Sequence, residues 1–275
     1  MMRQSIGQRQ RGLTLIELLV AMTLSIILLT GVIQVFSSNK KMFVFQNGVS
    51  SVQDSGRYAA LTFGYQLRLS GFVENAGQRL WDQQCLTQKG LVQCVAVEGV
   101  EDDPTRYGDG ITIRYQGGVD CLGNSNIPSK IVQNEFYVKD DDNGVPSLFC
   151  QGNSLDAAGV LMPEQAIISN IERMEILYGI DQDFNDVADR YIRYSDIANG
   201  RFKNKDIVSV EIGVMVTSNH AVRSKKDTQT FALPGATWQP SDYNNGDSNN
   251  DRLLRKMFSS IYTLRNRVNN GSIPK

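Results

Sequence analysis

The sequence has few of the residues from which catalytic and metal sites are usually built. It contains one histidine, His220, and four cysteines with no C-x-x-C pair among them. It also has no G-x-S-x-G motif, no P-loop motif and no internal repeat. General acid–base and nucleophilic chemistry therefore have little support, and we expect no enzymatic activity.

The chain also lacks an excess of charge of either sign. Its 28 lysines and arginines stand against 29 aspartates and glutamates, for a formal net charge of -1. Because a protein that holds nucleic acid normally carries a basic surface, we expect no direct nucleic acid binding. A hydrophobic content of 41% in 275 residues is enough for a packed core, so a disordered adaptor is excluded.

One long apolar run is present, near the N-terminus. Residues 13–36 carry a single charge, Glu17, and follow a leader that contains Arg3, Arg9 and Arg11. About 24 residues form roughly 36 Å of helix, which is enough to cross a bilayer core. The basic leader predicts that the N-terminus stays in the cytoplasm, so that the chain after this segment begins in the periplasm.

The order of the leader and the apolar run differs from that of a secretory signal, because the small residue Gly12 precedes the run instead of following it. The residues from Gly12 to Glu17, G-L-T-L-I-E, resemble the cleavage and methylation motif of type IV pilins and type II secretion pseudopilins. This resemblance implies that a prepilin peptidase cleaves after Gly12 and methylates the amine of Leu13. Removal of the three leader arginines takes the net charge from -1 to -4.

Glu17 lies about one helical turn into the apolar segment, where an ionisable group costs about 2.5 to 3.5 kcal/mol. The resemblance implies a compensating partner, which is the methylated amine of Leu13 on this or a neighbouring subunit, and a role in setting the stagger between subunits. One alternative is a carboxylate that only extends to the nearby interface. A plain membrane anchor is another, although it requires neither Gly12 nor Glu17.

The rest of the chain predicts an α+β fold. Residues 37–70 have an amphipathic pattern that continues the helix to about Leu69, and Gly71 is a plausible stop. Residues 71–275 form a β-rich head, in which Pro163 to Ile171 adds a short helix and an antiparallel sheet packs on the N-terminal helix. The expected strands include residues 110–115, 135–138, 173–178 and 208–216.

All four cysteines follow the apolar segment, on the side that the leader places outside the cytoplasm, so disulfides are expected. Of the three pairings, Cys85 with Cys94 and Cys121 with Cys150 close the shortest loops. Each bridge contributes roughly 2 to 4 kcal/mol to stability. Free buried thiols and a zinc site are the alternatives, the latter disfavoured by the missing C-x-x-C spacing.

One loop has the alternating oxygen side chains of a calcium site. Its expected ligands occupy positions one, three, five, seven and nine: Asp181, Asp183, Asn185, Val187 and Asp189. The sixth position is Asp186 instead of glycine and the twelfth is Ile192 instead of glutamate, so the loop departs from an EF-hand. A solvated acidic turn between two strands is the alternative.

Three later segments, Tyr178 to Asp181, Asp189 to Tyr191 and Leu264 to Arg267, resemble PilW-like minor pilins of the type IV pilus. That resemblance implies a subunit that joins other minor pilins and the major pilin through the inner-membrane assembly machinery. It would help to initiate pilus assembly and lie at the pilus tip, beneath an adhesin, and thereby contribute to adhesion, twitching motility or DNA uptake. The chain would be an inner-membrane protein before assembly and part of the extracellular pilus afterwards.

Two other functions remain open. A J-type pseudopilin would cap the short filament of a type II secretion system. A membrane-anchored binding module would use the head to hold calcium, glycan or DNA outside the cell. Ligand affinity of the head together with normal piliation after deletion of the gene would favour the binding module.

The processing hypothesis predicts the effect of Gly12→Ala. The peptidase should fail to cut this variant, which should remain in the membrane at full length. Mass spectrometry of the membrane fraction measures the outcome, and mature protein of unchanged mass would contradict the hypothesis.

Overall fold

The computed structural model describes residues 14–72, 97–100, 105–127, 130–202, 206–240 and 252–266. Gly12, Leu13, Cys85 and Cys94 lie outside these ranges, so the predictions that concern them are not tested here. The chain divides into two compact units, residues 1–47 and residues 48–275. Helix α1, Leu15–Leu69, begins in the first unit and ends in the second.

In the first unit, α1 exposes nearly all of its side chains. The large apolar side chains from Leu15 to Phe43 are at least 52% exposed, including those of the segment predicted to enter the membrane. The helix is long and apolar enough to cross a bilayer.

In the second unit, α1 buries one face. Its buried residues recur every three or four positions, as expected for a helix with one apolar stripe: Gly48, Val52, Gly56, Ala59, Phe63, Gln66 and Leu67. The helix ends as predicted, because Gly71 has a φ of 75°, which reverses the chain after Leu69.

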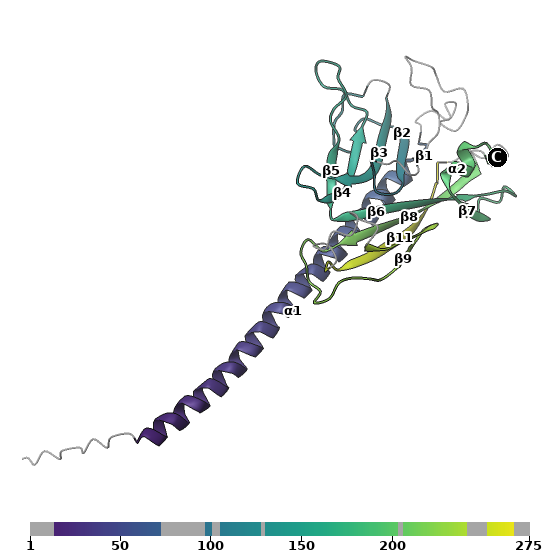
Figure 1. Ribbon diagram of the computed structural model, residues 1–275. Coiled ribbons are helices and arrows are strands. Elements are labelled where there is room, and N and C mark those ends of the chain that lie inside the picture. The colour runs from purple at the N-terminus through teal and green to yellow at the C-terminus, as the bar shows by residue number, and fades with distance from the viewer. Residues whose placement is uncertain are drawn as a thin grey trace, which may run out of the picture. The chain divides into compact units, whose positions relative to one another are not determined.

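The strands form two antiparallel sheets and a small hairpin (Figure 1). The first sheet contains five strands in chain order: β1 Val97–Val100, β2 Gly110–Gln116, β3 Ile131–Asp140, β4 Pro146–Gly152 and β5 Gln165–Ser169. The second has the order β11, β8, β6, β7: Arg255–Thr263, Ile207–Thr217, Ile171–Ile180 and Arg190–Ile192. The hairpin pairs β9, Phe231–Leu233, with β10, Ala236–Trp238, and the short helix α2 spans Tyr194–Ala198.

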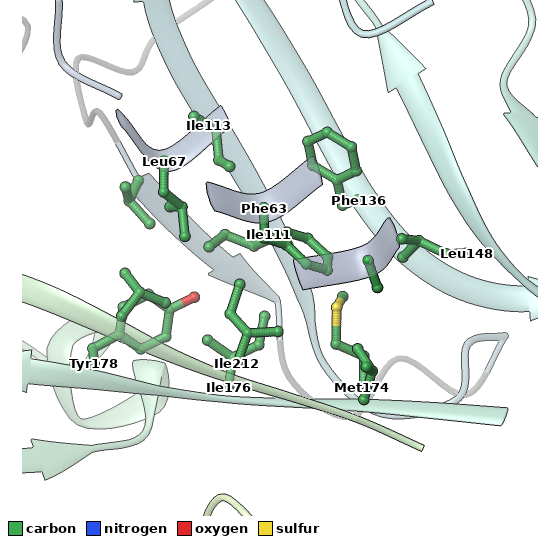
Figure 2. Packing of buried hydrophobic residues seen from close by; sticks show 14 of the residues in the cluster. Phe63, Leu67, Ile111, Ile113, Phe136, Leu148, Met174, Ile176, Tyr178 and Ile212 are labelled. Atoms are coloured by element: carbon green, nitrogen blue, oxygen red, sulfur yellow. The ribbon is translucent and has the colours of Figure 1, made fainter. Parts of the chain in front are cut away.

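The core lies where α1 and both sheets meet (Figure 2). Phe63 of α1 packs edge-on against Phe136 of β3, with ring centroids 5.6 Å apart. Met174 and Ile176 of β6 face the same cluster from the second sheet. Because all three layers contribute fully buried side chains, the head and the second half of α1 form one folding unit.

The α+β fold with an antiparallel head is confirmed, and strands β2, β3, β6 and β8 contain the four segments predicted above. The short helix from Pro163 to Ile171 is wrong, since these residues contain β5 and the start of β6. Their apolar spacing also suits a helix, but Ile168 pairs with Leu148 of β4. Asn170, with a φ of 63°, then turns the chain into β6.

Two long-range links stabilise the head. Cys121 and Cys150 form a disulfide, one of the two predicted pairs, with Cα atoms 6.5 Å apart. In the second sheet, Arg255 of β11 donates two hydrogen bonds to Glu172, of 2.8 and 2.9 Å, and both side chains are at most 1% exposed. A register shift between Ile171 and Arg173 interrupts the pairing of β6 with β8 at Glu172.

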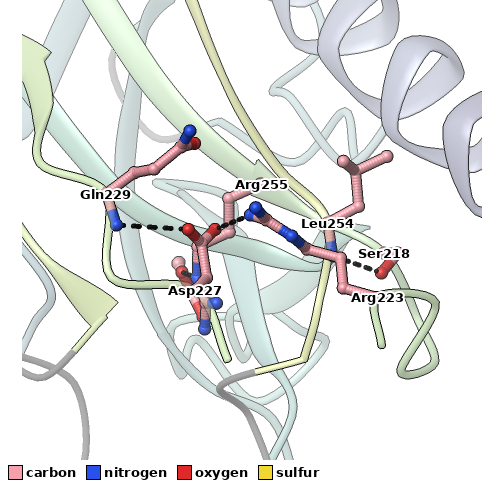
Figure 3. Close-up of polar contacts among 7 residues, drawn as sticks. Ser218, Arg223, Asp227, Gln229, Leu254 and Arg255 are labelled. Atoms are coloured by element: carbon pink, nitrogen blue, oxygen red, sulfur yellow. Dashed lines mark hydrogen bonds and ion pairs between the residues drawn. The ribbon is translucent and has the colours of Figure 1, made fainter. Parts of the chain in front are cut away.

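The segment between β8 and β9 carries a second buried charge (Figure 3). Asp227, whose side chain is fully buried, pairs with Arg223 at 2.6 Å and accepts a hydrogen bond from the backbone N–H of Gln229. Burial raises the pKa of Glu172, and hydrogen bonding to Arg255 only partly offsets it. The buried carboxylates of Glu172 and Asp227 thus each have an arginine partner, as expected for buried charges.

The close approach of α1 to β11 predicts opposite effects for two glycines. A Cβ at Gly56 would lie 2.4 Å from the ring of Phe258, whereas one at Gly64 would lie 3.4 Å from Tyr262, in ordinary contact. We expect Gly56→Ala to destabilise the protein by about 1 to 3 kcal/mol through overpacking. Gly64→Ala should stabilise it by about 0.5 to 1 kcal/mol through helix propensity.

Thermal unfolding of the full chain in detergent measures both changes. If the two substitutions change the unfolding temperature equally, the ring of Phe258 does not pack closely against Gly56.

Candidate functional site

The N-terminus of α1 contains a capping box made by Thr14 and Glu17. The Glu17 Oε2 atom accepts hydrogen bonds from the backbone N–H and the hydroxyl of Thr14, both at 3.1 Å. The backbone N–H of Glu17 donates to the Thr14 hydroxyl at 3.3 Å. This reciprocal arrangement satisfies donors at the end of the helix that would otherwise have no partner.

Sequence reasoning missed Thr14, although the T-x-x-E spacing of Thr14 and Glu17 is the known signature of a capping box. The cap gives Glu17 a second role beside the predicted pairing with the amine of Leu13. Both roles use the same carboxylate, whose second oxygen can accept a further donor. The pairing itself stays a prediction.

A face of α1 in the second unit is also exposed and partly apolar. Tyr58, Leu61 and Tyr65 are 55%, 64% and 64% exposed and lie within two helical turns. A shallow pocket of about 470 Å³ lies between this face and β5 and is lined by Tyr58, Leu61 and Ile167 among others. This face provides a surface for contact with another helix or strand.

The predicted calcium loop joins β6 to β7, as expected for a turn between these strands. Asp181, Asp183 and Asp189 lie together, with one carboxylate oxygen of each within 4.8 Å of the others. Asp181 is buried, while the other two are exposed. The structure therefore brings together three of the five predicted ligands.

The carboxylate of Asp181 already has several donors. Its Oδ1 atom accepts hydrogen bonds from the backbone N–H groups of Phe184 at 2.7 Å and Asn185 at 3.2 Å. Its Oδ2 atom accepts one from the backbone N–H of Asp186 at 2.8 Å. Desolvation acts to raise the pKa of Asp181, but these hydrogen bonds together lower it below its usual value. Asp181 is thus held ionised inside the loop.

The other predicted ligands also bond within the loop. The Asn185 amide donates to Asp183 Oδ2 at 2.9 Å, and Asn185 Oδ1 accepts from the backbone N–H of Val187 at 2.8 Å. Asp189 Oδ2 accepts from the backbone N–H of Gln182 at 2.7 Å. A calcium ion would have to share these oxygens with backbone donors, and the calcium site stays a prediction.

Two family models match the chain. The model described as Type IV Pilus-assembly protein W matches residues 135–266, from β3 to just after β11. The model of the prokaryotic N-terminal methylation motif matches residues 7–33, which include Gly12, Leu13 and Glu17. The two matches confirm the predicted resemblance at the anchor and in the head.

Comparison with solved structures gives weaker likenesses. A type IV-like pilin from Thermus thermophilus shares 11% identity, with a TM-score of 0.40, over 78% of this chain and 97% of that chain. A chain of the GspK-GspI-GspJ complex from the type 2 secretion system of enterotoxigenic Escherichia coli shares 12% identity, with a TM-score of 0.37 and the same coverage. No curated protein matches the sequence.

A calcium titration tests the predicted metal site. If the loop binds the ion, calcium at ten times its dissociation constant should stabilise the full chain by about 1.4 kcal/mol. The added calcium should therefore raise the unfolding temperature. Asp183→Asn and Asp189→Asn should each abolish that rise. Asp156→Asn, in an exposed turn with similar hydrogen bonds, should leave it unchanged. An unfolding temperature that does not respond to calcium would rule the site out.

Proposed function

We propose that this chain, a PilW-like minor pilin or pseudopilin, acts in the type IV pilus, where it helps to initiate assembly within a minor-pilin complex at the tip. The observation that carries the proposal is the exposed apolar half of α1 with Glu17 in its first turn. An apolar surface of this length requires lipid before assembly and other apolar helices afterwards. The prepilin-type motif supports that sequence of events.

Glu17 supplies specificity to this packing. Apolar helices alone slide against one another, because dispersion contacts have little preference for one axial position. A carboxylate in an apolar bundle is stable only beside a cation or a hydrogen-bond donor. Cleavage after Gly12 would create such a cation at Leu13, and its pairing with Glu17 of a neighbour would fix the register of the two helices.

The second half of α1 supports a further contact between subunits. The exposed face formed by Tyr58, Leu61 and Tyr65 belongs to the same helix as the apolar anchor. Aromatic side chains such as those of Tyr58 and Tyr65 are enriched at the cores of protein interfaces. We infer that this face lies against a neighbouring minor pilin or the major pilin.

A position at the tip suits the large head. The structure describes more than 150 residues of the head, which has its own hydrophobic core and a disulfide. A bulky head of this kind suits a few positions at the end of a filament better than repeated packing along a thin shaft. In this position the head would contact a tip adhesin and contribute to adhesion, twitching motility or DNA uptake, in a structural and not an enzymatic role.

A J-type pseudopilin of a type II secretion system is the second candidate, because the N-terminal methylation motif suits both machines. The match to the pilus-assembly family over the head favours the pilus. Surface pili counted in a deletion strain separate the two: the pilus role predicts their loss, and the secretion role predicts normal pili with loss of secreted enzymes.

Two substitutions at Glu17 separate its roles in capping and in pairing. Glu17→Ala removes the cap and the charge, and should be inserted and cleaved but absent from sheared pili. Glu17→Gln keeps an oxygen that accepts from Thr14 but has no charge, so it should also be absent if pairing with an amine is the assembly signal. The measurement is the amount of mature chain in sheared pili relative to membranes.

Thr14→Ala is the matched control, since it removes the hydroxyl of the cap and leaves the carboxylate. We expect its recovery in pili to remain close to that of the wild type. Normal recovery of Glu17→Gln would mean that capping, and not charge pairing, is the function of Glu17.

A further inference from the structure

The loop of residues 181–189, which we call the acidic loop, presents two large apolar side chains to solvent. Phe184 is 72% exposed and Val187 is 64% exposed. The loop connects the paired strands β6 and β7 at one end of the second sheet (Figure 1). Neither side chain belongs to the core clusters formed by the described residues of the head, so packing among those residues does not account for them.

Hydrogen bonds hold the acidic loop in one conformation. Three consecutive backbone N–H groups, those of Phe184, Asn185 and Asp186, donate to the carboxylate of Asp181. Both ends are tied as well, since Asp181 N–H donates to the Asp206 carbonyl and Asp189 N–H donates to the Ile180 carbonyl, each at 2.9 Å. The tip therefore loses little conformational freedom when it binds.

The backbone of the loop is strained where it carries the exposed ring. Phe184 has a φ of 62°, a value that bulky side chains rarely adopt, and Asp186 follows with a φ of 66°. Such strain persists only where surrounding bonds enforce it, and here the Asp181 carboxylate does so. Strained backbone is concentrated at functional sites, and aromatic side chains are enriched at the cores of protein interfaces.

The charge around the tip selects among partners. Asp181, Asp183, Asp186 and Asp189 lie in the loop, with no lysine or arginine between them. The three exposed carboxylates, those of Asp183, Asp186 and Asp189, would be repelled by anionic lipid surfaces and by nucleic acid. A sugar is disfavoured because the Asn185 amide and Asp183 bond to each other. An apolar pocket surrounded by basic side chains on another protein is complementary to this tip.

We propose that the acidic loop is a docking knob, in which Phe184 and Val187 enter an apolar pocket rimmed by lysine or arginine on a neighbouring pilin subunit. The choice of a pilin as partner rests on the proposed function. The loop is then a contact between heads that adds to the packing of α1 and specifies which subunit lies beside this one.

Photo-crosslinking in cells tests the knob with the full-length chain. A photoreactive phenylalanine analogue replaces Phe184, or replaces Val160 as the control, which is 60% exposed in another turn of the head. Position 184 should crosslink to a second protein with the N-terminal methylation motif, at a peptide rich in lysine or arginine. Position 160 should give no such product.

Charge reversal then tests complementarity. Asp183→Lys, combined with the analogue at position 184, should reduce the crosslinked product by about tenfold or more, as expected when a like charge faces a basic rim. Co-purification of the partner should fall similarly with Phe184→Ser and remain unchanged with Val160→Ser. A crosslink to lipid or polysaccharide, or a yield unaffected by Asp183→Lys, would overturn the proposal.

The recovery of each variant in sheared pili separates this proposal from the proposed function. If the wild-type chain is present in pili but position 184 gives no crosslink to a pilin, the docking knob is wrong and the pilus role stands. If the wild-type chain never enters pili, the proposed function itself fails.

Discussion

The assembly role described here depends on the free energy of one carboxylate in an apolar environment. Glu17 is the single charge in residues 13–36, and its ionised form is unstable in lipid or among apolar helices without a compensating donor or cation. Within one chain, Thr14 offers two hydrogen bonds but no positive charge. In the proposed function, the cationic chain end created by cleavage supplies that charge, and processing, insertion and subunit packing are then linked through this residue.

The rest of the molecule is arranged around the same helix. The first half of α1 has no burial of its apolar side chains, whereas the second half buries a regular stripe against two sheets. Because Gly48 and Gly56 have no side chain, the segment before β9 packs closely on α1 at Gly48, and Phe258 of β11 packs closely on α1 at Gly56. The head is thus built on the helix that also carries the apolar segment. The proposed contacts with partners use two exposed regions, the face of Tyr58, Leu61 and Tyr65 and the acidic loop.

Local patterns made much of the fold predictable. Alternating apolar residues marked β2, β3, β6 and β8, and the amphipathic pattern followed by the stop signal at Gly71 placed the end of α1 at Leu69. The error at Pro163 to Ile171 arose because a short apolar run suits either a helix or a strand until its neighbour β4 is known. The pairing of Glu172 with Arg255 spans 83 positions and has no local signal, so sequence reasoning could not find it. In the acidic loop, composition suggested metal ligands, while only the structure shows that Asp181 bonds to the backbone and that Phe184 is displayed.

The central claim is tested most directly by top-down mass spectrometry of the wild-type chain isolated from its native membranes. The account predicts a chain that begins at Leu13 and carries one added methyl group on its terminal amine, because cleavage after Gly12 creates the cationic chain end that pairs with Glu17 of a neighbour. A chain that still begins at Met1, without modification, would contradict it.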